Sequence, residues 1–288
     1  MDFLTILTPE MRQLLRQRCN EVVDAAIGRY RSSIVAVYGA KENGRPIHIG
    51  SAIFLEVNGR KVCLTAAHVV DENNFTTLYL AVGTELERLE AQFTITAAPL
   101  GRHKDHVDFA FCALPADLAS KFTGRFAATT EIANDGWDDK GRYYTALGYP
   151  YSKNRKYNPT KNSVTLQLFP YSNAHLVDDA IASNLPGKGV GHLFLPWSKK
   201  SRDEAGAIAN TTYPRGMSGG AVIDAGRPGA LSVFRGEAVP EPRLAGLIIE
   251  LKKKKVLLAL RLTVVLPFLL NAFPPVASEI SSDEADRS

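Results

Sequence analysis

The chain has 288 residues, of which 45% are hydrophobic and 22% charged, so composition excludes a disordered chain and allows a substantial core. The net charge of +4 is mild and the basic residues are spread along the chain except at residues 252–255, which argues against a nucleic-acid-binding protein. Three cysteines at unrelated spacings predict neither a disulfide framework nor a zinc motif.

The first predicted element is an N-terminal helix within residues 1–29. Thr8 can serve as its N-cap, Pro9 suits the first helical position, and Gly28 offers a stop. Apolar residues recur on one face, at positions 11, 14, 15, 22, 23 and 26. That face either packs on the chain's own body or docks a regulatory protein partner. The residues before the helix lack a basic n-region and a long apolar stretch, so we expect no secretory signal and a cytoplasmic location.

Short β-rich runs follow and predict an all-β fold. We expect strands over residues 34–38, 51–57, 61–65, 77–82, 92–97 and 109–114, with a tight hairpin at Asn58-Gly59. After a turn-rich connector at 134–142, strand character resumes at 143–148 and 164–169. Residues 151–162 and 173–210 look like long surface loops. The chain therefore divides into two β units of similar size, residues 30–133 and 143–273.

The C-terminal part begins with an apolar stretch at residues 256–273. Arg261 and Pro267 interrupt it and it is barely long enough for a membrane span. A buried strand over 256–265, followed by a short helix that opens at Pro267, explains the stretch better, so we expect no membrane contact. The tail, residues 274–288, is acidic and serine-rich and predicts disorder.

The most informative motif is Gly216-Met217-Ser218-Gly219-Gly220. Serine is a weak nucleophile at neutral pH, so chemistry through Ser218 requires a base and a third group that orients the base. At Gly216 the chain must turn sharply if the N–H groups of Gly216 and Ser218 are to meet at one oxygen, as in an oxyanion hole.

The partners expected for Ser218 are His68 as base and Asp108 as the orienting carboxylate. Asp108 opens the apolar run Asp-Phe-Ala-Phe, which would anchor it and partly bury it. Three other acids compete with it but open no apolar strand: Asp71, Asp105 and Asp117. The cluster of His103, Asp105, His106 and Asp108 can be drawn as a metal site, but alternating residues in a polar loop are poorly organised ligands, so we expect no metal and no cofactor.

Three segments together resemble trypsin-like (chymotrypsin-fold) serine peptidases: Leu-Thr-Ala-Ala-His68, Val-Asp108-Phe-Ala-Phe and Gly-Met-Ser218-Gly-Gly. The order His, Asp, Ser is the one that family uses, and a Gly-Tyr-Pro segment at 148–150 is similar to bacterial intracellular members, including HtrA-type enzymes. The resemblance covers residues 30–273. It implies two β-barrels with an N-terminal helix and a short C-terminal helix added here, and a cleft between the barrels.

The resemblance also implies a specificity pocket lined by Thr212 and the edge Ile248-Ile249-Glu250. Two departures matter. No Ile-Val-Gly-Gly terminus is present and Met217 stands where relatives have Asp, so activation by cleavage is not supported and control by a partner, by loop ordering or by substrate is expected instead. The main hypothesis is a serine endopeptidase acting on protein or peptide substrates. The alternative is a catalytically silent, protein-binding scaffold of the same fold.

Overall fold

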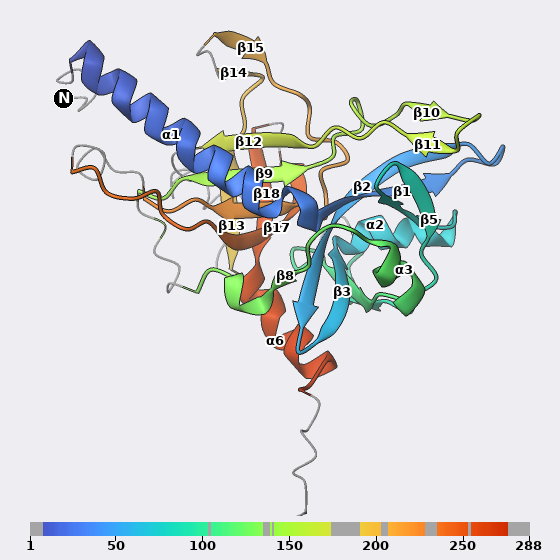
Figure 1. Ribbon diagram of the computed structural model, residues 1–288. Helices are drawn as coiled ribbons and strands as arrows, with labels where there is room; N and C mark the ends of the chain where they lie inside the picture. Colours follow the sequence, from blue (N-terminus) through green and yellow to red (C-terminus); the bar gives the residue numbers. More distant parts are fainter. Residues whose placement is uncertain are drawn as a thin grey trace, which may run out of the picture.

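The computed structural model describes residues 8–102, 105–134, 139, 141–173, 191–202, 207–227, 235–252 and 255–275. Most of the acidic tail predicted at 274–288, His103 of the considered metal cluster and most of the predicted loop at 173–210 lie outside these residues. Two β-sheets form the body, with one long N-terminal helix and a short C-terminal helix (Figure 1). The predicted all-β class with a helix at each end is confirmed.

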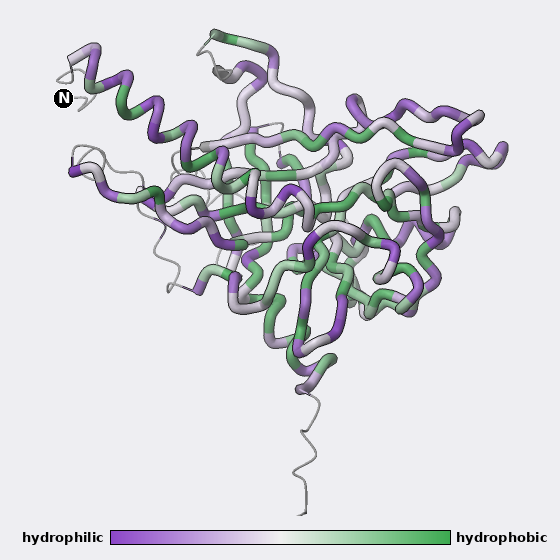
Figure 2. The backbone as a smooth tube through the Cα atoms, viewed as in Figure 1, coloured by the Kyte–Doolittle hydropathy of each residue, from purple (hydrophilic) through white to green (hydrophobic). Residues whose placement is uncertain are grey.

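Helix α1 (Pro9–Tyr30) begins as predicted, because the Thr8 side chain accepts a hydrogen bond from the Met11 N–H at 3.3 Å. It does not stop at Gly28. The side chain of Tyr30 is fully buried and its hydroxyl donates to the Pro242 carbonyl, so tertiary contacts hold the last turn. The first three turns stand away from the body and carry no buried side chain (Figures 1 and 2).

The first sheet has the strand order β10-β11-β5-β4-β1-β2-β3-β7-β6, with β8 parallel to β2. Residues Asn58 and Gly59 both have positive φ, +47° and +80°, and make the tight β2–β3 turn that was predicted. Its strands are β1 (Ile34–Ala40), β2 (Pro46–Val57), β3 (Arg60–Thr65), β4 (Tyr79–Val82), β5 (Glu85–Arg88), β6 (Thr94–Ile95), β7 (Ala110–Ala113), β8 (Ala127–Ala128), β10 (Tyr157–Asn158) and β11 (Ser163–Val164).

The second sheet has the order β12-β9-β16-β17-β18-β13, and β14 and β15 form a separate pair. Its central strands are buried on both faces, which explains their continuous apolar runs. The strands are β9 (Tyr144–Gly148), β12 (Phe169–Asn173), β13 (His192–Pro196), β16 (Ala221–Asp224), β17 (Arg243–Lys252) and β18 (Val256–Arg261), with β14 (Lys200–Arg202) and β15 (Ile208–Asn210) outside it.

Several expectations need correction. The predicted loop at 151–162 contains β10 and the turn to β11, and this hairpin pairs with β5 of the first sheet. Strand β18 ends at Arg261, and α6 (Leu262–Ala272) begins there with Pro267 inside it rather than at its start. Three short helical segments and two short helices were not predicted: Arg31–Ser33, Glu72–Asn74, Thr129–Glu131, α2 (Ala67–Asp71) and α3 (Ala116–Lys121).

The two sheets share one large core. It combines side chains of the first sheet, such as Tyr38 and Ile53, with side chains of the second, such as Leu147 and Leu247, all 1% exposed or less. Figure 2 shows that the hydrophobic residues concentrate in the strands of both sheets. None of the described helices is long and apolar enough to cross a membrane. The shared core fixes the position of the two sheets relative to each other.

Candidate active site

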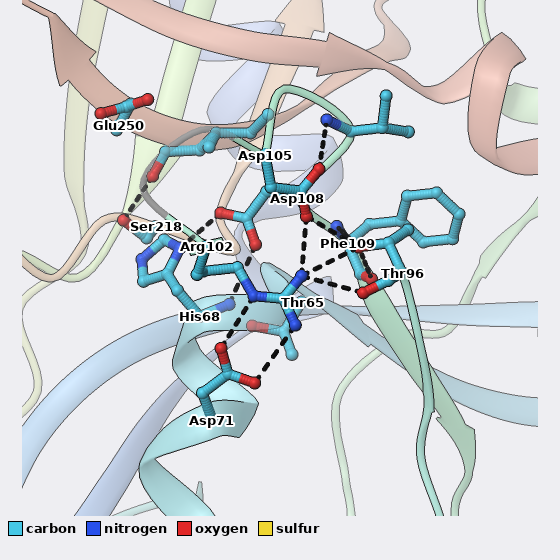
Figure 3. A network of polar contacts seen from close by, with 12 residues as sticks. Thr65, His68, Asp71, Thr96, Arg102, Asp105, Asp108, Phe109, Ser218 and Glu250 are labelled. Atoms are coloured by element: carbon cyan, nitrogen blue, oxygen red, sulfur yellow. Dashed lines mark hydrogen bonds and ion pairs between the residues drawn. The ribbon is translucent and has the colours of Figure 1, made fainter. Parts of the chain in front are cut away.

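His68 and Asp108 meet because the strands that precede and follow them are paired. His68 lies on α2, directly after β3, and Asp108 lies just before β7, with Thr65 opposite Ala110 in the ladder. The Asp108 side chain is 4% exposed and binds His68 twice: Oδ1 accepts from the His68 main-chain N–H at 2.9 Å, and Oδ2 contacts Nδ1 at 2.5 Å (Figure 3). With its proton on Nδ1, the ring presents Nε2 as the basic nitrogen.

The pKa of His68 results from opposing effects. Burial by itself lowers the pKa, but the hydrogen bond and the charge of Asp108, with smaller contributions from Glu250 and Asp71, outweigh it and raise the pKa above its ordinary value. Asp108 therefore both orients the imidazole and stabilises its protonated form. This is the electrostatic arrangement that a general base requires when it takes a proton during a reaction.

The Ser218 loop lies against the first sheet. The Ser51 N–H donates to the Ser218 carbonyl at 2.7 Å, and the chain at Gly219 passes so close that an added Cβ would be 1.9 Å from the Ser51 carbonyl oxygen and 2.3 Å from Thr65 Oγ1. Gly219 also has φ +84°. Thr65 lies three residues before His68, so the loop packs on the segment that leads into α2. Only glycine fits at position 219.

The Ser218 hydroxyl is half-buried and donates to the main-chain carbonyl of Ile249 at 2.6 Å. Within the described residues it makes no hydrogen bond to His68, which the predicted triad requires. Figure 3 shows His68, Asp108 and Ser218 in one close view, with the Ser218 contact directed away from the imidazole. The structure thus joins two of the three predicted residues directly, and the hydroxyl of the third is bonded to another partner.

Gly216 has φ +91°, and a side chain there would collide with its surroundings. An added Cβ would be 2.7 Å from the His48 ring and 2.9 Å from the Tyr151 nitrogen. His48 is buried, which lowers its pKa to about 3 despite a main-chain contact at Gly50, so its ring is neutral. Neither the Gly216 N–H nor the Ser218 N–H donates to an acceptor in the described part of the chain. For both N–H groups the role of oxyanion donor stays a prediction.

Sequence reasoning missed Ser51. Its side chain is fully buried, donates to the Gly216 carbonyl at 3.0 Å and accepts from the Tyr149 N–H at 2.9 Å. With the main-chain bond to Ser218, this residue fixes both ends of the segment 216–218. One signal pointed to it: a serine in the middle of an otherwise apolar run, where a buried hydroxyl needs partners.

The predicted pocket residues lie in different environments. The side chains of Ile248 and Ile249 are 1% exposed and pack in the cores, which leaves only the main chain of this edge to line the predicted pocket. Thr212 is half-buried. Glu250 is partly exposed, forms an ion pair with Lys252 and acts on His68 electrostatically. For Thr212 and Glu250 a role in substrate binding stays a prediction.

The competing acids do not bind His68 directly. Asp71 and Asp105 are both ion-paired with Arg102, and Asp117 is exposed on α3. In the part of the chain that the structure describes, no group of three or more His, Cys, Asp or Glu side chains is arranged to hold a metal ion. Among the acids considered, Asp108 alone contacts the His68 ring.

Comparisons with known proteins identify the family of the chain. The model of the trypsin-like peptidase domain matches residues 50–228, well over half of the chain. No curated protein sequence matches. Solved structures similar to the chain include the HtrA-type protease AlgW with tripeptide (15% identity, TM-score 0.47, covering 88% of this chain and 64% of that one). Another is described as "Aromatic interactions drive the coupled folding and binding of the intrinsically disordered Sesbania mosaic virus VPg protein" (15% identity, TM-score 0.45, covering 83% of this chain and 90% of that one). The chain belongs to the trypsin-like peptidase family and has its two-unit, chymotrypsin-like β fold.

Proposed function

We propose that this protein is a serine endopeptidase that cleaves protein substrates through an acyl-enzyme, with Ser218 as nucleophile, His68 as general base and Asp108 as the group that orients it. The observation that carries the proposal is the double contact of Asp108 with His68, through the main-chain N–H and through Nδ1. This arrangement fixes the tautomer and leaves Nε2 for proton transfer, which a purely structural ion pair does not need.

The proposed reaction starts with a rotation of the Ser218 hydroxyl from the Ile249 carbonyl to His68 Nε2. As the Ser218 oxygen bonds to the substrate carbonyl carbon, its proton passes to Nε2, and the N–H groups of Gly216 and Ser218 stabilise the resulting oxyanion. His68 then returns the proton to the leaving amine as the peptide C–N bond breaks. Water, activated by His68, hydrolyses the acyl-enzyme in the same way.

One observation favours the alternative of a catalytically silent scaffold that binds protein segments. The Ser218 hydroxyl is bonded to the Ile249 carbonyl at 2.6 Å and not to His68. The two functions require different partners of the Ser218 hydroxyl, and a serine hydroxyl changes its direction by rotation about χ1. Reactivity towards an active-site probe therefore separates the two functions.

The test is labelling with a fluorophosphonate probe, which bonds to an activated serine. We expect wild type to be labelled, Ser218→Ala not at all, and His68→Gln slower by at least about 10³-fold, since triad members act as a unit. The rate should fall as the pH falls through the raised pKa of His68, because only the neutral imidazole accepts the proton. A wild-type chain that stays unlabelled, also in extract of its native cells, would refute the proposed peptidase and favour the scaffold.

Regulation by a protein partner through α1 and a cytoplasmic location are further parts of the proposal. The first three turns of α1 support the former, since they contain no buried side chain and Leu14 is 48% exposed. The test compares the rate of fluorophosphonate labelling with and without cell extract. Extract that speeds the labelling of the full chain, but not of a chain lacking residues 1–20, would indicate such control.

A further inference from the structure

Arg102 lies at the centre of a polar network below the His68–Asp108 pair (Figure 3). Its guanidinium binds Asp71 with two groups, Nε to Oδ2 at 2.8 Å and Nη2 to Oδ1 at 3.2 Å. Its third nitrogen, Nη1, donates to Asp105 Oδ2 at 2.7 Å and to the Thr96 carbonyl at 2.9 Å. All three guanidinium nitrogens of Arg102 thus form hydrogen bonds, and together they connect Asp71, Asp105 and Thr96.

Asp105 is the most buried of these partners, with a side chain that is 6% exposed. Besides Arg102, its carboxylate accepts from the Val107 N–H at 2.9 Å and from the Thr96 hydroxyl at 3.2 Å. A buried carboxylate requires a charged partner and several hydrogen bonds to offset its loss of hydration. Because Asp105 orders the main chain at Val107, it acts on the residue immediately before Asp108.

Asp71 connects the same arginine to the histidine. It is the last residue of α2, and His68 is the second. The helix is therefore attached at both of its ends to this part of the chain, through the His68 contacts with Asp108 and through the Asp71 contacts with Arg102. Two attachments prevent the helix from pivoting about the Asp108 contact, which a single attachment would permit.

We propose that Arg102 is a positioning residue for the reaction, a planar clamp that holds the helix of His68 against the loop of Asp108. The proposal rests on the serine peptidase function proposed above. Arg102 touches neither the imidazole nor Ser218, so its effect passes through Asp71 and Asp105. Lysine cannot replace it fully, because an ammonium group lacks the fork that reaches Asp71 with two nitrogens while a third binds Asp105.

The clamp also has an electrostatic consequence. The charged groups that act on the His68 ring are Asp108, Glu250 and Asp71, and Arg102 neutralises Asp71 and Asp105 while Lys252 pairs with Glu250. Without Arg102, the charge of Asp71 would be unshielded. The pKa of His68 would then rise further.

The experiment compares Arg102→Gln, Arg102→Lys and the control Arg142→Gln with wild type. Arg142 pairs with Asp224 in the second sheet, and that pair is as buried as Arg102 with Asp105. The readouts are the inactivation constants of the fluorophosphonate and the NMR titration of the His68 imidazole, whose signals are identified by their loss in His68→Gln. The titration does not depend on activity, so it tests Arg102 even if wild type is unreactive and the proposed function fails.

For Arg102→Gln we expect the maximal inactivation rate to fall about 10- to 100-fold with little change in probe affinity, because misplacement of a catalytic group by about 1 Å costs up to that factor. The His68 titration should move to higher pH. Arg102→Lys should restore the titration but only part of the rate, and Arg142→Gln should change neither.

The proposal is overturned if Arg102→Gln keeps the wild-type titration of His68 and an inactivation rate within about twofold of wild type, since a factor of two is only about 0.4 kcal/mol of barrier. A full return of the inactivation rate in Arg102→Lys would also overturn it. If Arg102→Gln does not fold, Asp71→Ala removes one arm of the clamp and leaves Asp105 paired. Slower inactivation of Asp71→Ala supports the clamp, and an unchanged rate refutes it.

Discussion

Replacing Ser51 by alanine should destabilise the protein and slow its reaction with serine-directed probes. The substitution keeps the main-chain bond to Ser218 but removes the hydroxyl that joins the Gly216 carbonyl and the Tyr149 N–H. Both of these groups are buried, and Ser51 is their only hydrogen-bond partner among the described residues. The substitution therefore not only removes two hydrogen bonds but also leaves two buried polar groups without a partner.

Each buried group left without a partner costs about 1–3 kcal/mol, so we expect Ser51→Ala to lower the free energy of unfolding by about 2–6 kcal/mol. Urea unfolding followed by circular dichroism measures this change. Because the Gly216 peptide is no longer held, we also expect fluorophosphonate labelling to slow by about 10-fold or more, the effect of a misplaced oxyanion donor.

The matched control is Ser33→Ala. Ser33 is as buried as Ser51, but its hydroxyl has no hydrogen-bond partner within the described residues. Removing that hydroxyl deletes a buried polar group that makes no bond, so stability should stay the same or rise slightly. The reasoning is refuted if Ser51→Ala loses no more stability than Ser33→Ala.

Two further predictions concern backbone fit and pH. Gly219→Ala should lower the free energy of unfolding by several kcal/mol, because its Cβ would overlap the Ser51 carbonyl. Gly59→Ala, with similar φ but open space around it, should lower that free energy by only about 1–2 kcal/mol. Equal losses for the two variants in urea unfolding would contradict this prediction. The pKa of Glu131 is lowered to about 2, since its bonds to Arg125, Ala128 and Arg29 outweigh the effect of burial, which raises it. A carboxyl group whose pKa is lowered by folding stabilises the fold at pH values above its ordinary pKa. The stability advantage of wild type over Glu131→Gln should therefore be constant above about pH 5 and disappear as the pH falls towards 2. An advantage that does not depend on pH would refute the assignment.

The candidate site was partly readable in the sequence because its chemistry is concentrated in short motifs. Small residues precede His68 and glycines flank the Ser218 segment. Glycines at such positions indicate backbone conformations or close contacts that no other residue type permits. Asp108 could be chosen over Asp71 and Asp105 because it opens an apolar strand, and strands β3 and β7 do pair at that point. Its double contact with His68 could not be foreseen from either segment alone.

Arg102 and the orientation of the Ser218 hydroxyl had no comparable signal. An arginine in a polar loop resembles a solvated charge until the fold brings Asp71 and Thr96 around it. The Ser218 hydroxyl finds the Ile249 carbonyl, 31 residues further on, only because strands β16 and β17 pair in one register. Both depend on distances between segments, which a local pattern does not contain.

For the protein as a whole, the sequence by itself determined what depends on near neighbours: the capped start of α1 at Thr8, the positive-φ turn at Asn58-Gly59, and the apolar runs that become strands. Tertiary structure alone decided the end of α1 at Tyr30 beyond Gly28 and the pairing of the β10–β11 hairpin with β5. Those outcomes are set by contacts between residues many tens of positions apart. Their free energies outweigh weak local preferences, because a buried side chain or a completed ladder contributes more than the propensity of one or two residues.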